Sequence, residues 1–388
     1  MNLAVGIADA HPGWELLLKQ EGVPYSLVAD LPRADTYAVI VAGNRLDYRQ
    51  SKFLNTFLED GGALLCSTRA FACLSLPASP ELLALSPTSL DESRRASRSG
   101  QRGEQAGGRQ ASFQRCRYTG DFVEYVVGGD EGPFRSIGVV DISRGCQILP
   151  QANALRTNHG TPSAYVGSIG RGSIVVLPFD PAETMLYDDS LTKSFYSKEK
   201  RLPFERVATL HKGGVARIVR SALQYLFAQR GLPYCHSWYY PGSEPTLFLF
   251  RVDTDHGTEE RIRQLASLAQ RRQIPFTWFV DVQSQQFHLN VFKELQGHEV
   301  AVHGYEHRVF SRKQEFERDL RTALSELERS GLHPEGVAAP YGAWTHSLGE
   351  AMQSCRFQYS SEFSYDYDSL PGYPLLSIGA SDVLQIPI

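Results

Sequence analysis

The sequence predicts a two-domain protein of the α/β class. Its 388 residues exceed a typical single domain, and 42% of them are hydrophobic, as in ordinary globular proteins. Short apolar runs of strand-like composition alternate with helical stretches in both halves of the chain. Such alternation predicts parallel sheets covered by helices. We place the domains at residues 1–232 and 233–388.

The first domain alternates strands and helices from its first residues. In chain order we expect a strand at 3–7, a helix at 14–20, strands at 25–28 and 37–42, a helix at 50–58, a strand at 63–66, a strand at 174–177 and a helix at 215–228. The turn at 170–173 is typical of a hairpin, since neither a Lys nor a helix start follows it as in a phosphate-binding loop. These elements predict a parallel sheet with helices on both faces.

A polar insertion at about residues 80–115 interrupts this pattern. Residues 91–115 carry six Arg against three acidic residues and almost no apolar side chain. Such a segment cannot bury a core, so we expect a flexible, solvated loop. The alternative is a nucleic-acid-binding arm, but no other basic patch supports a nucleic-acid partner.

The stretch Tyr37–Gly43, followed by a helix and then Asp60–Leu65, resembles the class I glutamine-amidotransferase-like fold, a flavodoxin-like architecture. Enzymes of that fold carry their nucleophilic Cys in a Gly-x-Cys-x-Gly turn, which this sequence lacks. Cys66 lies instead in an apolar run, where a buried thiol is usually inert. The resemblance therefore implies a fold, and we expect a structural or sugar-binding role for this domain.

Two carboxylates open the second domain. Asp253 and Asp255 close a strand-like run at 247–252, and strand alternation points residues two apart to the same face. An Asp-x-Asp at a strand end is more often a solvated turn or a helix cap. The alternative interpretation of Asp253 and Asp255 is that both carboxylates face one functional site.

Two histidines follow a second apolar run. After residues 300–302, a turn of helix would place His303 and His307 on one side, although a helix can also present such a pair to water. One Asp and two His make a three-ligand site with an open position, as a catalytic zinc requires. The pattern suggests hydrolysis.

The order of these motifs resembles the polysaccharide deacetylase family, the NodB-homology domain of carbohydrate esterase family 4, over roughly residues 245–388. The family's base Asp and metal Asp match Asp253 and Asp255, separated here by one residue. Its His-Ser/Thr-x-x-His motif matches His303 to His307, with Gly304 at the second place. Residues 276–280 resemble the family's second strand.

The resemblance implies an irregular (β/α) barrel and a metal-dependent removal of N-acetyl or O-acetyl groups from a carbohydrate. Asp255, His303 and His307 would hold the metal, most plausibly zinc. Asp253 would take a proton from water, and the backbone N–H of Tyr341 would stabilise the oxyanion. Pro340 and Trp344 would contact the substrate.

The sequence departs from the family at two places. In the third motif, Arg-x-Pro-Tyr-Gly, Pro340 to Gly342 match but Ala338 replaces the Arg. Arg251, on the same strand face as Asp253, is our predicted substitute; an Arg at the domain interface is the alternative. The family's acid, a His in a late strand, would come just after residues 384–388, so we expect a barrel incomplete at its C-terminus or a lost acid. A catalytically inactive carbohydrate-binding relative, or an assembly module of a polysaccharide pathway, is the alternative function.

Three features of the sequence bear on the protein's localisation in the cell: its cysteines, its first residues and its apolar runs. The six cysteines are scattered without a Cys-x-x-Cys pair, which argues against a disulfide framework and for reduced thiols. The first residues lack the pattern of a secretory signal, and no run approaches the roughly 18 apolar residues of a membrane span. We therefore expect a cytoplasmic protein without a membrane span.

Overall fold

The fold is described from a computed structural model. The described residues are 3–28, 34–43, 46–74, 122–127, 136–141, 156–157, 164–177, 179–186, 190–194, 204–208, 212–240, 242, 244–362, 371–377 and 379–387. The predicted insertion at about 80–115 lies outside them. The chain divides into two compact units, one of Met1–Asp189 and Thr209–Ser237, the other of Ser190–Ala208 and Trp238–Ile388.

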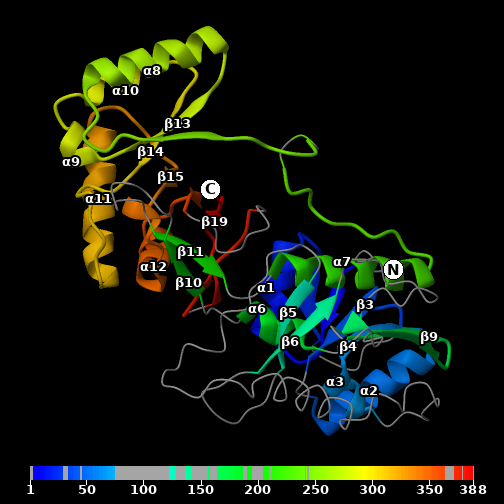
Figure 1. Ribbon diagram of the computed structural model, residues 1–388. Helices are drawn as coiled ribbons and strands as arrows, with labels where there is room; N and C mark the ends of the chain where they lie inside the picture. Colours follow the sequence, from blue (N-terminus) through cyan, green and yellow to red (C-terminus); the bar gives the residue numbers. More distant parts are fainter. Residues whose placement is uncertain are drawn as a thin grey trace, which may run out of the picture. The chain divides into compact units, whose positions relative to one another are not determined.

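The first unit contains a six-stranded, mostly parallel sheet in the order β2-β1-β3-β4-β9-β8. Its strands β3, β4 and β9 are labelled in Figure 1. Its strands are β1 (Val5–Ile7), β2 (Tyr25–Leu27), β3 (Val39–Ala42), β4 (Ala63–Ser67), β8 (Tyr165–Ile169) and β9 (Gly172–Leu177). Only β8 is antiparallel, joined to β9 by the hairpin turn that the sequence predicts. Gly170 has φ +57°, a conformation that glycine adopts readily in such turns.

Helices cover both faces of this sheet. On one face, α2 (Tyr48–Glu59) and α3 (Thr68–Ala72) share a buried cluster with β3 and β4 that includes Phe57 and Leu64. On the other, α7 (Lys212–Gln229) contacts β3, β4 and β9, and α1 (Pro12–Gln20) contacts α6 (Pro181–Leu186). Cys66 is fully buried, and this burial raises the pKa of its thiol, which keeps it protonated and unreactive.

The remaining small sheets are antiparallel. One has three strands, β5 (Phe122–Val127), β6 (Ser136–Asp141) and β7 (Arg156–Thr157); two others are the pairs β10 (Ser190–Ser194) with β11 (Phe204–Ala208), and β17 (Leu375–Leu376) with β18 (Gly379–Ala380).

The second unit contains six parallel strands in the order β12-β13-β14-β15-β16-β19. They are β12 (Phe250–Asp253), β13 (Phe276–Val280), β14 (Glu299–Val302), β15 (Gly336–Val337), β16 (Tyr359–Ser360) and β19 (Leu384–Gln385). Because neighbours in space follow one another along the chain, each crossover advances in the same direction. The result is a curled parallel sheet, a half-barrel of the kind a deacetylase-type barrel requires.

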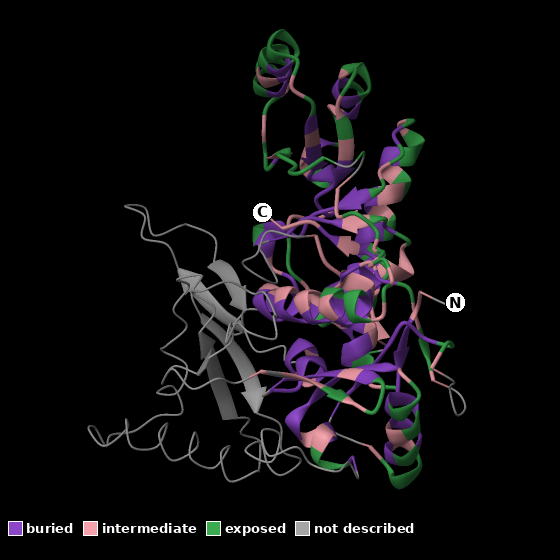
Figure 2. Ribbon diagram, turned by 90° about the vertical axis from the view of Figure 1, so that its right-hand side faces the viewer, coloured by how far each residue is buried: buried purple, intermediate pink, exposed green. Residues whose placement is uncertain are grey.

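Helices cover one face of this curled sheet. They are α8 (Glu259–Arg272), α9 (Val282–Gln285), α10 (Leu289–Glu294), α11 (Lys313–Arg329) and α12 (His346–Ser354), with a 3-10 turn, η2 (Pro340–Gly342), after β15. On α11, Phe316, Leu320, Ala323 and Leu327 recur at helical spacing and are buried against the sheet. Figure 2 shows such apolar faces as buried and the outer helix faces as exposed.

The opposite face of the sheet carries a smaller cluster, Phe279, Ala301 and Ala338, with Tyr359 against it. Asp253 and His303 lie on this same face. Asp253 pairs with Phe279, and His303 comes two residues after Ala301, so strand alternation points it to the same side. No helix in the described part of the chain is long and apolar enough to cross a membrane.

Candidate metal centre

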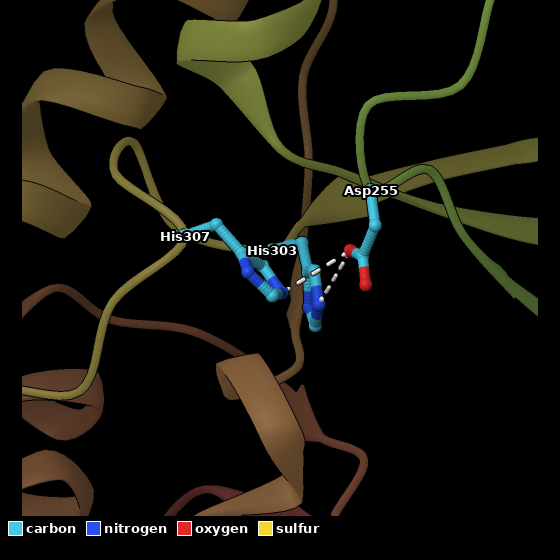
Figure 3. A group of neighbouring side chains, drawn as sticks. All are labelled: Asp255, His303 and His307. Carbon is cyan, nitrogen blue, oxygen red and sulfur yellow. Dashed lines mark ion pairs between the residues drawn. The ribbon is translucent and has the colours of Figure 1, made fainter. Parts of the chain in front are cut away.

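Asp255, His303 and His307 lie together at the carboxyl ends of β12 and β14 (Figure 3). Asp255 Oδ1 is 3.2 Å from His303 Nε2 and 3.2 Å from His307 Nε2. One carboxylate oxygen and two imidazole nitrogens therefore face one point. Asp255 is 44% exposed, which leaves one side of the group open to solvent.

His303 is held in a single orientation. Its backbone N–H donates to Val280 O at 2.8 Å, and its ring Nδ1 is 3.0 Å from Ala338 O. Because a carbonyl can only accept, Nδ1 carries the proton and donates it there. The Nε2 lone pair is then free, the tautomer in which metal-bound histidines are usually fixed.

The protonation states of the other two groups also suit a cation. Burial lowers the pKa of His307, and the close approach of His303 Nε2 to the carboxylate lowers the pKa of Asp255. At neutral pH the imidazole is therefore neutral and the carboxylate charged, as metal binding requires. Among the described residues, the buried His307 Nε2 has no hydrogen-bond partner. A divalent metal ion fits this donor set.

The segment from His303 to His307 is a loop, so the helical turn that we predicted there is wrong. Gly304 has φ +86°, outside the right-handed helical region. The Asp319 carboxylate on α11 accepts hydrogen bonds from Tyr305 N and Glu306 N, both at 2.9 Å. These backbone N–H groups are thus bound by a side chain, and the loop brings both imidazoles to one side.

The loop is held from its other side by α9. Val282 N donates to Gly304 O at 3.2 Å and Gln283 N donates to Tyr305 O at 2.9 Å. Both polar edges of the loop are therefore paired.

The Asp253 carboxylate is bonded to Arg251. Arg251 Nη2 donates to Asp253 Oδ1 at 2.6 Å and to Oδ2 at 2.8 Å, and Nε donates to Oδ1 at 3.1 Å. The guanidinium also donates from Nη1 to Ser361 O at 2.5 Å and lies over the Phe279 ring, 4.7 Å from its centroid. Arg251 is thus fixed by three neighbours.

The position of the family's motif-three Arg is enclosed. Ala338 is fully buried, its N–H donates to Val302 O, and its carbonyl accepts from His303. The next residue, Ala339, donates its N–H to the buried carboxylate of Glu362 at 3.0 Å. Burial raises the pKa of Glu362.

Tyr341 is the exposed aromatic residue beside the histidines. It is 57% exposed, its ring centroid is 4.6 Å from that of His307, and its φ is +61°. Its backbone N–H has no acceptor among the described residues. Pro340 and Trp344 are buried, so their assignment to the substrate stays a prediction.

The sequence patterns did not predict two residues of the site, Asp319 and Asp281. Asp319 lies in the middle of an amphipathic helix, where an acid normally faces water. Asp281, directly after β13, is buried beside the histidines. Its position after a strand of the same sheet is the signal that could have identified it.

Comparison with known families supports this reading of the second unit. Residues 252–360 match the family model of polysaccharide deacetylases, a metal-dependent family that acts on acetylated carbohydrates. The match covers the acid pair, both histidines and the Pro-Tyr-Gly motif. No curated protein sequence matches the chain.

Several solved structures are similar to parts of the chain. A Mycobacterium smegmatis protein described as a polysaccharide deacetylase is 19% identical, with a TM-score of 0.34; the match covers 39% of this chain and 61% of that one. A family 4 carbohydrate esterase from Streptomyces lividans is 16% identical, with a TM-score of 0.27 and coverages of 30% and 60%. A family 4 pseudoenzyme from Bacillus anthracis is 14% identical, with a TM-score of 0.27 and coverages of 28% and 40%. This chain thus spans less than two thirds of each.

Proposed function

We propose that the second unit is a metal-dependent hydrolase that removes an N-acetyl or O-acetyl group from a carbohydrate. The observation that carries the proposal is the convergence of Asp255, His303 and His307 within a segment that matches the deacetylase model. Zinc is the ion we expect, since two imidazoles and a carboxylate with an open position suit it.

Asp255, His303 and His307 would hold the ion. The chemistry that a divalent ion supplies in such a site is Lewis-acid activation of a carbonyl and of a water molecule. The fixed tautomer of His303 and the clamped loop keep the two imidazole donor atoms in place without substrate.

Asp253 is the proposed general base. It would take a proton from the attacking water as the new C–O bond forms at the acetyl carbon. The Arg251 guanidinium would hold the carboxylate in one orientation. Cleavage of the C–N or C–O bond then releases acetate, and the leaving atom takes up a proton.

The oxyanion would be stabilised by the backbone N–H of Tyr341. That N–H is unbonded within the described part of the chain and belongs to a residue whose ring contacts His307. Preorganised donors of this kind stabilise charge that develops only during reaction. Pro340 and Trp344 would shape the wall behind the Tyr341 ring.

For the first unit we propose a flavodoxin-like fold of the amidotransferase-like type, without catalysis of its own. The spatial order β2-β1-β3-β4-β9 of its parallel strands supports this assignment. We further propose that the protein acts in the cytoplasm, because its cysteines are scattered without the spacing of a disulfide framework.

The test is acetate release from an N-acetylglucosamine oligomer and from an O-acetylated xylan, with and without added zinc. We expect zinc-dependent release by the parent, and at least about 10²-fold less by Asp253→Asn and His307→Ala. Glu328→Gln, on the exposed face of α11, is the matched control. A protein that binds zinc and carbohydrate but releases no acetate would favour the alternative, an inactive carbohydrate-binding module.

A further inference from the structure

Asp281 is a buried carboxylate that accepts no hydrogen bond from the part of the chain that the structure describes. Its side chain is 2% exposed, and neither Oδ1 nor Oδ2 has a hydrogen-bond partner within the described residues. His256 is the described residue that forms a long ion-pair contact with it: His256 Nδ1 is 4.0 Å from Oδ2, and the His256 side chain is 77% exposed. A buried charge without a partner is unfavourable, so this carboxylate requires a cation or a donor beyond those that the described residues supply.

Helix capping does not explain this carboxylate. Asp281 precedes α9, where an Asp normally accepts a hydrogen bond from a backbone N–H of the first turn, but no such bond forms. The first two N–H groups of α9 donate to the His303–His307 loop instead. The Asp281 backbone N–H donates to Thr254 Oγ1 at 3.0 Å, which fixes the residue but leaves its carboxylate unpaired.

The position of Asp281 relates it to the candidate metal centre. It follows β13, the strand between β12 and β14, from which Asp255 and His303 extend. Val280, the residue before it, accepts the His303 backbone N–H and is paired with Val302. The negative charge of Asp281 also acts on His307, where it opposes the effect of burial on the pKa of the imidazole.

The three aspartates Asp253, Asp255 and Asp281 differ in whether their negative charge is already neutralised by a neighbour. Asp253 is neutralised by Arg251 through three hydrogen bonds. Asp255 contributes one negative charge to the centre, and both histidine ligands are neutral in the metal-binding state. One unpaired negative charge cannot balance a divalent cation, whereas Asp255 and Asp281 together can.

We propose that Asp281 supplies the second negative charge with which this centre binds a divalent cation. It acts through the electric field and through water in the centre, and it is not one of the three residues that offer a ligand atom to the common point. Gln285, whose backbone N–H donates to Asp281 O at 3.1 Å, is also buried, and its Oε1 has no partner among the described residues. This inference rests on the metal centre of the proposed function.

The test compares the parent with Asp281→Asn, which keeps the shape and removes the charge. By titration calorimetry with zinc chloride, we expect binding about 10- to 100-fold weaker, the usual effect of changing a group that supports metal ligands. In the absence of metal, we expect the variant to melt at the same or a higher temperature, because an unpaired buried charge has been removed. A purely structural Asp281 would instead lower the melting temperature without metal and leave zinc affinity unchanged.

Two controls make the outcome specific. Glu335→Gln removes an exposed acid of the second unit and should leave zinc affinity as in the parent. His256→Asn keeps a residue that tolerates positive φ and should also bind zinc like the parent; an effect equal to that of Asp281→Asn would show that His256 is the carboxylate's partner and overturn the proposal. If Asp281→Asn does not fold, Asp281→Ser offers a smaller neutral side chain with the same expected results.

The failures are distinguishable. Zinc binding by the parent with equal affinity in Asp281→Asn overturns this inference and leaves the proposed function standing. A parent that takes up no divalent ion overturns the metal centre itself, and this inference with it.

Discussion

Arg251 and Asp253 lie two residues apart on one face of β12 and are joined by three hydrogen bonds, at 2.6, 2.8 and 3.1 Å. The guanidinium is further fixed by Ser361 O and by the Phe279 ring. An Arg needs such supports to orient a carboxylate, because its own stem is flexible. Arg251 on β12 thus supplies the guanidinium beside Asp253 that Ala338, at the position of the family's Arg, cannot supply.

The first prediction concerns this pair. Arg251→Ala should lower kcat by about 10²-fold with zinc content unchanged, because the base loses its orientation while the ligands remain. Arg251→Lys should recover little, since an ammonium cannot form the forked contact. The measurement is kcat for acetate release beside zinc content, with Arg261→Ala on α8 as control. Full activity in Arg251→Ala would remove Arg251 from the mechanism.

A second prediction concerns Asp319, which binds the N–H groups of Tyr305 and Glu306 at 2.9 Å. Asp319→Ala should destabilise the second unit by about 3 kcal/mol, since two half-buried donors lose a charged acceptor. Zinc affinity should fall as well, because Tyr305 and Glu306 belong to the loop from His303 to His307 that positions both histidines. Glu328→Ala, exposed on the same helix, should change neither quantity. An unaltered zinc affinity in Asp319→Ala would show that the loop keeps its shape without the clamp.

A third prediction uses the glycine between the ligands. A Cβ on Gly304, at φ +86°, would lie 3.0 Å from Glu306 O and 3.2 Å from Asp319 Oδ2. Gly304→Ser, although it restores the family's usual residue, should therefore lower the melting temperature and zinc affinity. Gly297→Ser is the matched control: φ is +78°, but no atom lies within 4 Å of its Cβ, so it should cost only the backbone strain of about 1–3 kcal/mol. Equal effects at both positions would argue against crowding in the loop.

Much of the fold was predictable because it rests on local patterns. The strands expected at 3–7, 37–42 and 63–66 and the helices at 14–20, 50–58 and 215–228 are present, with boundaries shifted by a few residues. The grouping of Asp255 with the two histidines was predictable because parallel strands bring their carboxyl ends to one edge.

The remaining features of the site depend on contacts distant in sequence. The loop conformation at Gly304 depends on Asp319, fifteen positions further along and on another element. Asp281 is buried, and its backbone N–H is bound by Thr254, 27 positions earlier in the chain. Neither contact produces a periodic pattern in the sequence. We therefore predicted a helical turn after His303 and did not identify Asp281.

A fourth prediction concerns pH and the first unit. Asp180 precedes α6, and its Oδ1 accepts from Ala182 N at 2.9 Å, whereas its buried Oδ2 is unpartnered among the described residues. Burial raises the pKa of Asp180 from 3.8 to about 6. The folded state therefore holds this proton more tightly than the unfolded state, which stabilises the fold below about pH 4 and is lost as pH rises through about 6.

Replacement by Asn should remove that dependence. Asp180→Asn keeps the acceptor for Ala182 N and should be more stable than the parent above about pH 6, by up to about 3 kcal/mol. Urea unfolding of both proteins at about pH 4 and about pH 8 measures the difference. A variant that is less stable than the parent at about pH 8 would show that the Asp180 charge has a partner in solution.

The most direct test of the account is the metal content of the protein after zinc saturation and gel filtration. The parent should retain about one zinc ion per chain, and Asp255→Ala, His303→Ala and His307→Ala should retain almost none. His346→Ala, an exposed histidine of the same unit, should retain as much as the parent. Equal zinc content in the parent and in all three ligand variants would contradict the central claim that these residues form a metal centre.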